Sequence, residues 1–219
     1  MGIEIDLLKH YPKTKRDISQ RGAEKTEEDR IVARKFGEEF FDGERRHGYG
    51  GFSYSPKFWK PVVPDFKEFY GLTKESSILD IGCAKGFMLN DFIEEIPGIN
   101  ARGIDISNYA IEHCKESVKN LVDVGDARHL PFENNTFDLV ISINTIHNLE
   151  IEELKKALKE ISRVSRKHAF ITVDAYRSKE EKEAMFAWNL TAKTILSVDE
   201  WLALFEESEY SGDYFWFMP

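Results

Sequence analysis

The chain has 219 residues, enough for one domain with a substantial core, and its apolar fraction of 42% excludes wholesale disorder. Its formal net charge is −9, whereas a sequence-independent grip on a phosphate backbone needs clustered Lys and Arg. The compact basic groups are Lys13, Lys15 and Arg16, and then Arg45 and Arg46. We therefore expect no nucleic-acid partner.

Cysteine usage and hydropathy indicate the compartment. The two cysteines, Cys83 and Cys114, lack the spacing of a zinc site or a disulfide framework, so no metal is expected. The first ten residues mix charges with short apolar pairs, unlike a signal peptide, and no apolar run approaches the length of a membrane span. These features predict a cytoplasmic protein without a membrane partner.

The N-terminal part differs in pattern from the rest. Apolar side chains at Ile31, Phe36 and Phe40 recur at near-helical spacing and predict a helix over residues 27–41. Residues 42–54 are rich in glycine and aromatic side chains, which favours a loop.

A second N-terminal helix is expected over residues 62–70, between two prolines and Gly71. We interpret residues 1–70 as a helical extension and aromatic lid, and residues 71–219 as the main domain. No internal repeat or low-complexity linker divides the chain further.

From Ser76 onwards, short apolar runs alternate with helical patterns. The expected strands cover residues 77–81, 102–106, 121–124, 137–143, 168–173 and 213–217. The expected helices cover residues 87–96, 108–120, 151–164, 178–194 and 197–210, the last with a capping box at Ser197 and Glu200. This alternation predicts a doubly wound α/β fold with about seven strands, a mostly parallel sheet and helices on both faces.

A glycine turn, Gly82-Cys83-Ala84-Lys85-Gly86, follows the first of these strands. A nucleoside triphosphate loop is excluded because Phe87 follows the last glycine, where that loop needs Lys. A dinucleotide turn is disfavoured because Ala84 and Phe87 stand where it needs glycines. Asp80, just before the turn, would repel a pyrophosphate and attract a sulfonium or ammonium group. The pattern favours a cationic ligand that has no phosphate.

The stretch Ile78-Leu79-Asp80-Ile81-Gly82-Cys83-Ala84-Lys85-Gly86 resembles the first motif of class I S-adenosylmethionine-dependent methyltransferases, with Ala84 in place of the middle glycine. Three later stretches are similar to the next motifs of that family, in the same order: Gly103–Ser107, Gly125–Ala127 and Asp138–Asn144. The resemblance extends over residues 76–174. It implies S-adenosylmethionine as cofactor and S-adenosylhomocysteine as product.

The same resemblance implies a set of cofactor contacts. Asp105 would accept hydrogen bonds from both ribose hydroxyls, and Asp126 would accept one from the adenine amino group. The density of aromatic side chains in the lid adds two contacts, because a sulfonium is attracted to aromatic faces. The complete set is Asp80, Gly82, Cys83, Ala84, Gly86, Asp105, Ile106, Asp126, Ala127 and Asn144, with Tyr54 and Trp59 from the lid.

Acceptor chemistry is expected where the fourth strand ends. An alcohol acceptor needs a general base, and His147 has a suitable unperturbed pKa. The other interpretation of His147 is that it lines the pocket or caps the strand. Asn144 and Tyr49 are the further candidates for catalytic residues, by orienting the acceptor and by covering it.

The acceptor itself is predicted to be a small polar molecule. The lid stretch from Phe41 to Phe52 resembles methyltransferases of bacterial surface-polysaccharide gene clusters. That resemblance implies a sugar, nucleotide-linked or phosphoramidate-type intermediate of capsule biosynthesis, with O-methylation slightly ahead. Methylation of a small amine, a non-catalytic S-adenosylmethionine-binding protein and a nicotinamide oxidoreductase are the alternatives.

Overall fold

Among the residues that the computed structural model describes, 2–12 and 25–218, seven strands form one parallel sheet. They are β1 (Ser77–Ile81), β2 (Asn100–Asp105), β3 (Val122–Val124), β4 (Phe137–Ile143), β5 (Ser165–Tyr176), β6 (Leu196–Ser197) and β7 (Asp213–Phe217). Their order is β3-β2-β1-β4-β5, with β6 and β7 both paired to β5. The predicted basic group Lys13, Lys15 and Arg16 lies outside the described residues.

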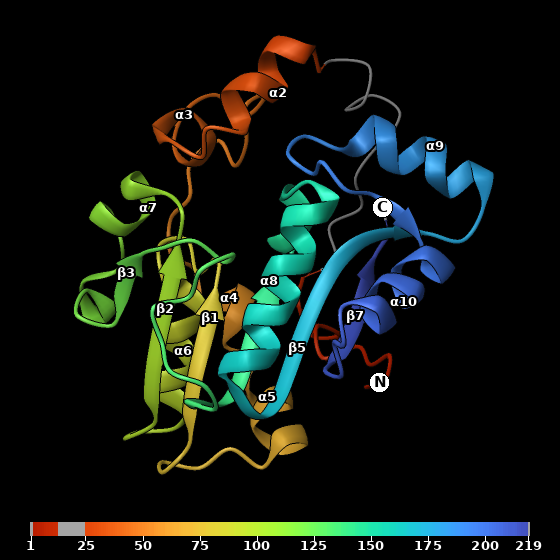
Figure 1. Ribbon diagram of the computed structural model, residues 1–219. Coiled ribbons are helices and arrows are strands. Elements are labelled where there is room, and N and C mark those ends of the chain that lie inside the picture. Colours follow the sequence, from red (N-terminus) through yellow and green to blue (C-terminus); the bar gives the residue numbers. More distant parts are fainter. Residues whose placement is uncertain (1, 13–24, 219) are drawn as a thin grey trace.

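Helices cover both faces of this sheet (Figure 1). They are α2 (Glu27–Ala33), α3 (Glu38–Phe41), α4 (Pro56–Trp59), α5 (Val63–Tyr70), α6 (Phe87–Glu95), α7 (Asn108–Glu112), α8 (Ile151–Val164), α9 (Lys179–Trp188) and α10 (Val198–Glu207), with short 3-10 helices η1 (Glu116–Val118) and η2 (Ile146–Asn148). The doubly wound α/β fold predicted from the sequence is confirmed. None of the described helices is long and apolar enough to cross a membrane.

Two apolar cores lie on opposite sides of the sheet. Side chains of alternate residues along a strand point to opposite faces. Ile78 of β1 packs with Phe66 and Phe92 of α5 and α6, whereas its neighbour Leu79 packs with Leu158 and other residues of α8 and α10. All five residues of β1 are buried, as expected for a central parallel strand.

The predicted helix over residues 27–41 is two helices in the structure. Helix α2 ends at Ala33, and Phe36 has a left-handed backbone with φ of 50°. The Phe36 carbonyl accepts a hydrogen bond from the hydroxyl of Ser107, after β2. This contact with the main domain breaks the helical periodicity, and α3 begins after Gly37.

The predicted helix over residues 108–120 is shorter in the structure, where α7 ends at Glu112. The backbone N–H of Lys115 donates to the carbonyl of Lys85 in the glycine turn, at 3.0 Å. That bond draws the chain out of the helix and into η1.

The predicted helix over residues 178–194 ends early, at Trp188. The backbone N–H groups of Lys193 and Thr194 both donate to the carbonyl of His147, at 3.0 Å each. The segment after α9 therefore returns to the sheet edge as a loop. Strand β5, by contrast, is longer than predicted, because it pairs with β4 on one side and with β6 and β7 on the other.

Residues 2–12 pack against the sheet, apart from the rest of the N-terminal segment. The N–H of Ile5 donates to the carbonyl of Tyr214 in β7, at 2.9 Å, and the N–H of Tyr214 donates to Ile3, at 3.1 Å. Leu7 belongs to the same apolar core as α5 and α6. The division of the chain at residue 70 stays a prediction.

Candidate functional site

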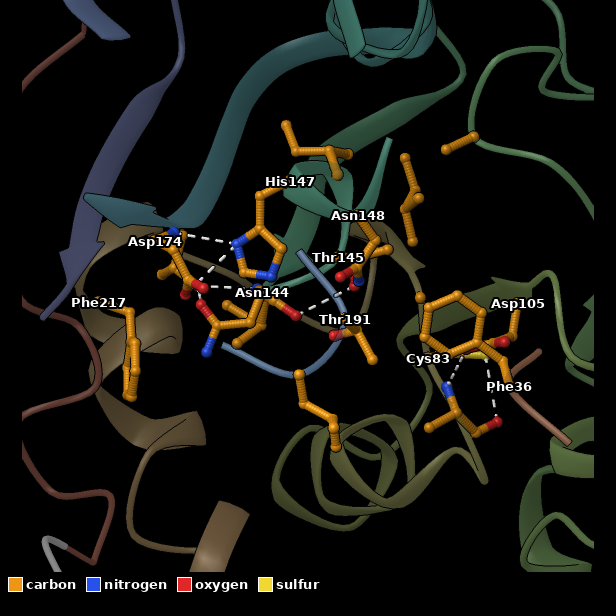
Figure 2. A pocket seen from close by; sticks show the side chains of 18 of the residues that line it. Phe36, Cys83, Asp105, Asn144, Thr145, His147, Asn148, Asp174, Thr191 and Phe217 are labelled. Carbon is orange, nitrogen blue, oxygen red and sulfur yellow. Dashed lines mark hydrogen bonds and ion pairs between the residues drawn. The ribbon is translucent and has the colours of Figure 1, made fainter. Parts of the chain in front are cut away.

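A cavity of about 1150 Å³ lies at the carboxyl edge of the sheet, and residues of α3 and α9 contribute to its lining. Figure 1 shows α2, α3 and α9 beyond that edge of the sheet. Its walls come from the ends of β1, β2, β4 and β5, from the N-terminal helices and from both ends of the described chain. Figure 2 shows two groups of lining side chains, one around Asp105 and Cys83, the other around Asn144, His147 and Asp174.

The glycine turn forms the floor of the cavity beside the first group. Gly82 has φ of 80°, and its N–H donates to the carbonyl of Ile104 at 2.7 Å. A Cβ on Gly82 would lie 2.0 Å from Oγ1 of Thr145, so glycine is required there on both grounds. Ala84 also has a left-handed backbone, with φ of 50°. The small side chain of alanine makes it the mildest replacement for glycine at that position.

Asp105 connects the end of β2 to this turn. Its Oδ2 accepts the N–H of Ala84 and its Oδ1 accepts the N–H of Ser107, both at 2.8 Å. Burial raises the pKa of Asp105, and these two N–H groups act against that rise. A carboxylate has about four acceptor positions, so two remain for ligand hydroxyls.

Asp80 is the second buried carboxylate beside the turn. Its side chain lines the cavity and is 5% exposed. Burial, and then the nearby charge of Asp105, raise the pKa of Asp80 to about 7. A cation bound next to it would stabilise the ionised form.

These residues fit S-adenosylmethionine. The two carboxylates provide acceptors for ribose hydroxyls and a counter-charge for an ammonium or sulfonium group. Lys85, the cation of the turn, pairs with Asp42 of the lid at 2.6 Å and therefore does not neutralise them. Cys83 lines the same end, and burial raises the pKa of its thiol, so a neutral packing residue is the consistent interpretation. Ile106 and Ala127 also line the cavity, as predicted for cofactor contacts.

Asp126 lines the cavity near the end of β3, but its carboxylate already has a partner. The Arg128 guanidinium donates to both of its oxygens, at 2.9 Å from Nε, and also contacts Glu153. Hydrogen bonds from Arg128 lower the pKa of Asp126. An adenine amino group would share this carboxylate with Arg128.

Two of the predicted cofactor contacts lie outside the cavity lining. Gly86 is the residue before α6, with φ of 74°, and a Cβ there would lie 2.5 Å from a methyl of Val118. Its role is in the turn and its packing. The hydroxyl of Tyr54 donates to Oδ1 of Asp91 at 2.6 Å, away from the cavity. Sequence could place Tyr54 in an aromatic segment but could not give the direction of its side chain.

Aromatic side chains of the predicted lid line the cavity above the turn. Phe36, Phe40, Tyr49 and Phe52 contribute to the lining, and the rings of Tyr49 and Phe52 lie 4.2 Å apart. Phe36 lies beside Asp105 in Figure 2. Trp59 lines the cavity too, and its contact with the cofactor stays a prediction.

Asn144 lies where β4 ends, as expected, in a left-handed backbone with φ of 49°. The side-chain oxygen Oδ1 of Asn144 accepts a hydrogen bond from the Thr172 hydroxyl at 2.8 Å. The backbone N–H of Asn144 donates to the same hydroxyl oxygen at 2.9 Å. Because the amide oxygen is occupied by Thr172, the amide nitrogen of Asn144 is the group left for a ligand.

His147 lines the cavity, but its hydrogen bonding argues against a general base. Its Nδ1 accepts the backbone N–H of Asp174 at 2.9 Å, so the neutral ring carries its proton on Nε2. Burial lowers the pKa of His147, against the opposing effects of Asp174 and the Asn144 backbone. The nitrogen that could take a proton is occupied, which disfavours the predicted base; the role of His147 stays a prediction.

Sequence reasoning missed Phe36 and Thr172 as lining residues, whereas it expected the acceptor to enter beside residues 174–176, of which Asp174 lines the cavity. Thr172 and Asp174 follow from the β4–β5 register, in which Ile143 pairs with Thr172. The alternation of side chains along β5 was a usable signal once that register was known. Within the described residues, no group of three or more His, Cys, Asp or Glu side chains is arranged to hold a metal ion.

The fold and the site define a class. A strand, a glycine turn and a helix, with carboxylates ending the first two strands, form the cofactor edge of class I methyltransferases, and residues 79–173 match the methyltransferase domain family. This segment is thus similar to methyltransferase domains.

Particular relatives differ in their acceptors. A tRNA (carboxymethyluridine(34)-5-O)-methyltransferase from Arabidopsis thaliana is 33% identical over 68% of this chain and 35% of its own length. Sterol 24-C-methyltransferase erg6 from Schizosaccharomyces pombe is 33% identical over 55% of this chain and 34% of its own length. The chain therefore spans about a third of the length of these curated relatives.

Among solved structures, an S-adenosylmethionine-dependent methyltransferase from Aquifex aeolicus superposes with a TM-score of 0.51. It is 20% identical, over 67% of this chain and 78% of that one. This likeness supports the fold.

Proposed function

We propose that the protein transfers a methyl group from S-adenosylmethionine to a hydroxyl group of a small polar molecule. The observation that carries the proposal is the pair of buried carboxylates, Asp80 and Asp105, at the ends of adjacent strands beside the glycine turn. Asp105 accepts a hydrogen bond from the turn itself, which fixes its position. A nucleoside that carries a cation and no phosphate matches this arrangement.

In this proposal each group has a separate task. Asp105 binds the ribose, Asp126 the adenine amino group, and Asp80 the cationic part of the cofactor. The aromatic lid excludes water, and Asn144 orients the acceptor. Catalysis then consists mainly of positioning two reactants in a cavity with little water.

The finer proposal is that the acceptor is a sugar, nucleotide-linked or phosphoramidate-type intermediate of surface-polysaccharide synthesis. Two rings, Trp188 and Phe217, line the cavity and would pack against a sugar ring. Lys193 and Arg177 also line it and would pair with a phosphate.

The relatives do not favour this acceptor over others, because the two curated proteins act on tRNA and on a sterol by their names. The expectation that nucleic acid is no partner has no support from them. An acceptor assay should therefore offer trideuteromethyl-labelled S-adenosylmethionine with nucleotide sugars and with tRNA. Label in tRNA alone would overturn the small-molecule proposal.

The first test is binding. We expect S-adenosylmethionine and S-adenosylhomocysteine to bind with micromolar affinity in calorimetry, and NADH to give no signal. Asp105→Ala removes charge-assisted hydrogen bonds and should weaken S-adenosylhomocysteine about 10- to 100-fold. Asp123→Ala, at an exposed position in β3, is the matched control. Binding of NADH instead of the sulfur ligands would overturn the proposed function.

A further inference from the structure

Asp174 near the end of β5 is a buried carboxylate to which the proposed function gives no task. It is 7% exposed, and its side chain lines the cavity on the acceptor side, beside Asn144 and His147 (Figure 2). Within the described residues, no donor lies within hydrogen-bond distance of its oxygens, and the nearest charged or ionisable atom is Nδ1 of His147, 3.5 Å from Oδ1.

His147 does not neutralise this carboxylate. Its Nδ1 is the acceptor of the Asp174 backbone N–H, so that nitrogen has no proton to donate to Oδ1. Burial also disfavours a charged imidazole at this position by lowering the pKa of His147. The ring instead fixes the backbone of Asp174.

The backbone of Asp174 is held on its other side as well. Its carbonyl accepts the indole N–H of Trp201, a fully buried residue of α10, at 2.9 Å. A carboxylate on a backbone fixed at both its N–H and its carbonyl is preorganised, as a group that acts on a bound substrate needs to be.

The neighbouring polar group complements the carboxylate. Asn144 has its amide oxygen bonded to the hydroxyl of Thr172, which leaves its amide nitrogen as a donor. An acceptor between Asn144 and Asp174 therefore meets one donor and one acceptor. A hydroxyl satisfies both, because it accepts and donates, whereas an ammonium group has no lone pair for the amide.

We propose that Asp174 is the general base for a hydroxyl acceptor, with His147 as its positioning residue. This inference rests on the proposed function and specifies its substrate class. As the acceptor oxygen forms its bond to the methyl carbon, the S–CH3 bond breaks and the sulfur leaves as a neutral thioether. The O–H proton passes to a carboxylate oxygen of Asp174, so charge and atoms balance.

The electrostatics of the site agree with this task. Burial raises the pKa of Asp174, and the charge of Lys25 acts against that rise. A carboxylate with a raised pKa is a stronger base than an exposed one, while it stays available as the anion at neutral pH when a cation lies near.

A binding experiment tests the position of Asp174 without knowledge of the acceptor. Sinefungin has a carbon in place of the sulfur of S-adenosylmethionine and an amine in place of its methyl group. Its ammonium group therefore lies at the position of the transferred methyl. We expect the protein to prefer sinefungin to S-adenosylhomocysteine in calorimetry. In Asp174→Asn this preference should fall about tenfold, with S-adenosylhomocysteine affinity unchanged.

The matched control is Asp6→Asn. Asp6 lines the same cavity, and its Oδ1 accepts the backbone N–H of Leu8 at 3.0 Å. The variant removes one negative charge from the cavity lining and leaves Asp174 in place. The sinefungin preference should persist in this variant. An equal preference in the wild type and Asp174→Asn would overturn the proposal, while absent S-adenosylhomocysteine binding in the wild type would overturn the proposed function on which it rests.

A turnover experiment separates base from positioning residue. With hexoses and nucleoside diphosphate sugars as acceptors, Asp174→Asn should lower kcat about 10²- to 10⁴-fold. His147→Asn keeps an acceptor near the Asp174 N–H and should cost less than about tenfold. The reverse order, or product methylated on nitrogen, would contradict the assignment. If no compound of the panel is methylated, the sinefungin preference decides the matter.

Discussion

Gly82 carries more constraints than any other glycine of the cofactor edge. Its backbone is left-handed, its N–H bonds to β2, and Thr145 occupies the space where a side chain would lie. Thr145 is in turn fixed by its hydroxyl, which donates to the carbonyl of Ile143 at 3.0 Å. The neighbour therefore has little freedom to move away.

Gly82→Ala should be strongly destabilising. A strained left-handed alanine costs on the order of 1–3 kcal/mol, and the contact with Thr145 adds to that cost. Urea unfolding followed by circular dichroism measures the free energy of unfolding. The affinity for S-adenosylhomocysteine is measured separately on the folded protein. Gly37→Ala is the control: nothing lies within 4 Å of its built Cβ and φ is −92°, so about 0.5 kcal/mol is expected. Equal losses in the two variants would contradict this interpretation of the turn.

Residues near the glycine turn could be placed from sequence because their order along the chain fixes their place in space. Asp80 and Asp105 each end a strand of a parallel pair, so their meeting follows from topology. Thr172 could not be placed in this way, because its position beside Asn144 depends on the register between β5 and β4. The hydrogen-bond partner of Nδ1 of His147 could not be predicted from sequence either, because it is a backbone N–H of another strand.

At the scale of elements, one contact joins the lid to the cofactor turn. Asp42, just after α3, accepts Nζ of Lys85 at 2.6 Å and the hydroxyl of Tyr109 at 2.7 Å. Lys85 belongs to the glycine turn, and Tyr109 to α7. The lid and the two elements that flank the cofactor edge are thus connected through one carboxylate.

We expect Asp42→Asn to speed the release of S-adenosylhomocysteine about tenfold, because a charge-assisted contact between lid and turn is lost. Stopped-flow displacement measures the rate. Lys67→Gln, which breaks an exposed ion pair with Glu95, is the control and should leave the rate unchanged. Identical rates in all three proteins would mean that the lid does not limit release.

The pH dependence of this contact has a definite sign. Burial acts to raise the pKa of Asp42, but hydrogen bonds from Lys85, Phe52 and Tyr109 outweigh it and lower the pKa to about 2. A lowered carboxyl pKa keeps the contact intact above the ordinary value of 3.8. The release rate of the wild type should therefore not change through this group between pH 5 and pH 8.

Helix ends were the elements that sequence placed least well. Helical periodicity continued past Ala33, Glu112 and Trp188, yet each helix stops there. In the regions beyond these ends, backbone groups bond to distant parts of the chain, such as the carbonyls of Lys85 and His147. Local pattern contains no information on such partners, whereas the Ser197 capping box, a purely local signal, is confirmed.

At the scale of the whole molecule, the buried carboxylates at the carboxyl edge of the sheet make the stability of the ligand-free fold depend on pH. Asp80, Asp105 and Asp174 all have a raised pKa, with burial as the main cause. An acid whose pKa is raised on folding holds its proton longer in the folded state. The folded state is then favoured at lower pH, and stability falls as the carboxyl ionises.

We expect the free energy of unfolding of the ligand-free protein to fall by about 1 kcal/mol between pH 6.5 and pH 8. Asp80, with a pKa of about 7, ionises in this window. His147, whose pKa burial lowers from 6.5, opposes this trend below pH 6.5 and more weakly in the lower part of the window, because the unfolded imidazole is still half protonated at pH 6.5. Denaturant unfolding at both pH values measures the difference. In Asp80→Asn the decline should shrink, and an unchanged decline would assign it to other groups.

The backbone bonds between Ile3, Ile5 and Tyr214 join positions about 210 residues apart, and Glu4 and Phe217 line the same cavity. During synthesis on the ribosome, the strands and the turn of the cofactor edge emerge well before β7. A nascent chain that stops short of residue 213 holds the carboxylates Asp80 and Asp105 but has neither β7, the last strand to pair with β5, nor the part of the cavity wall that follows it. The order of translation thus leaves the cavity wall incomplete until synthesis has passed β7.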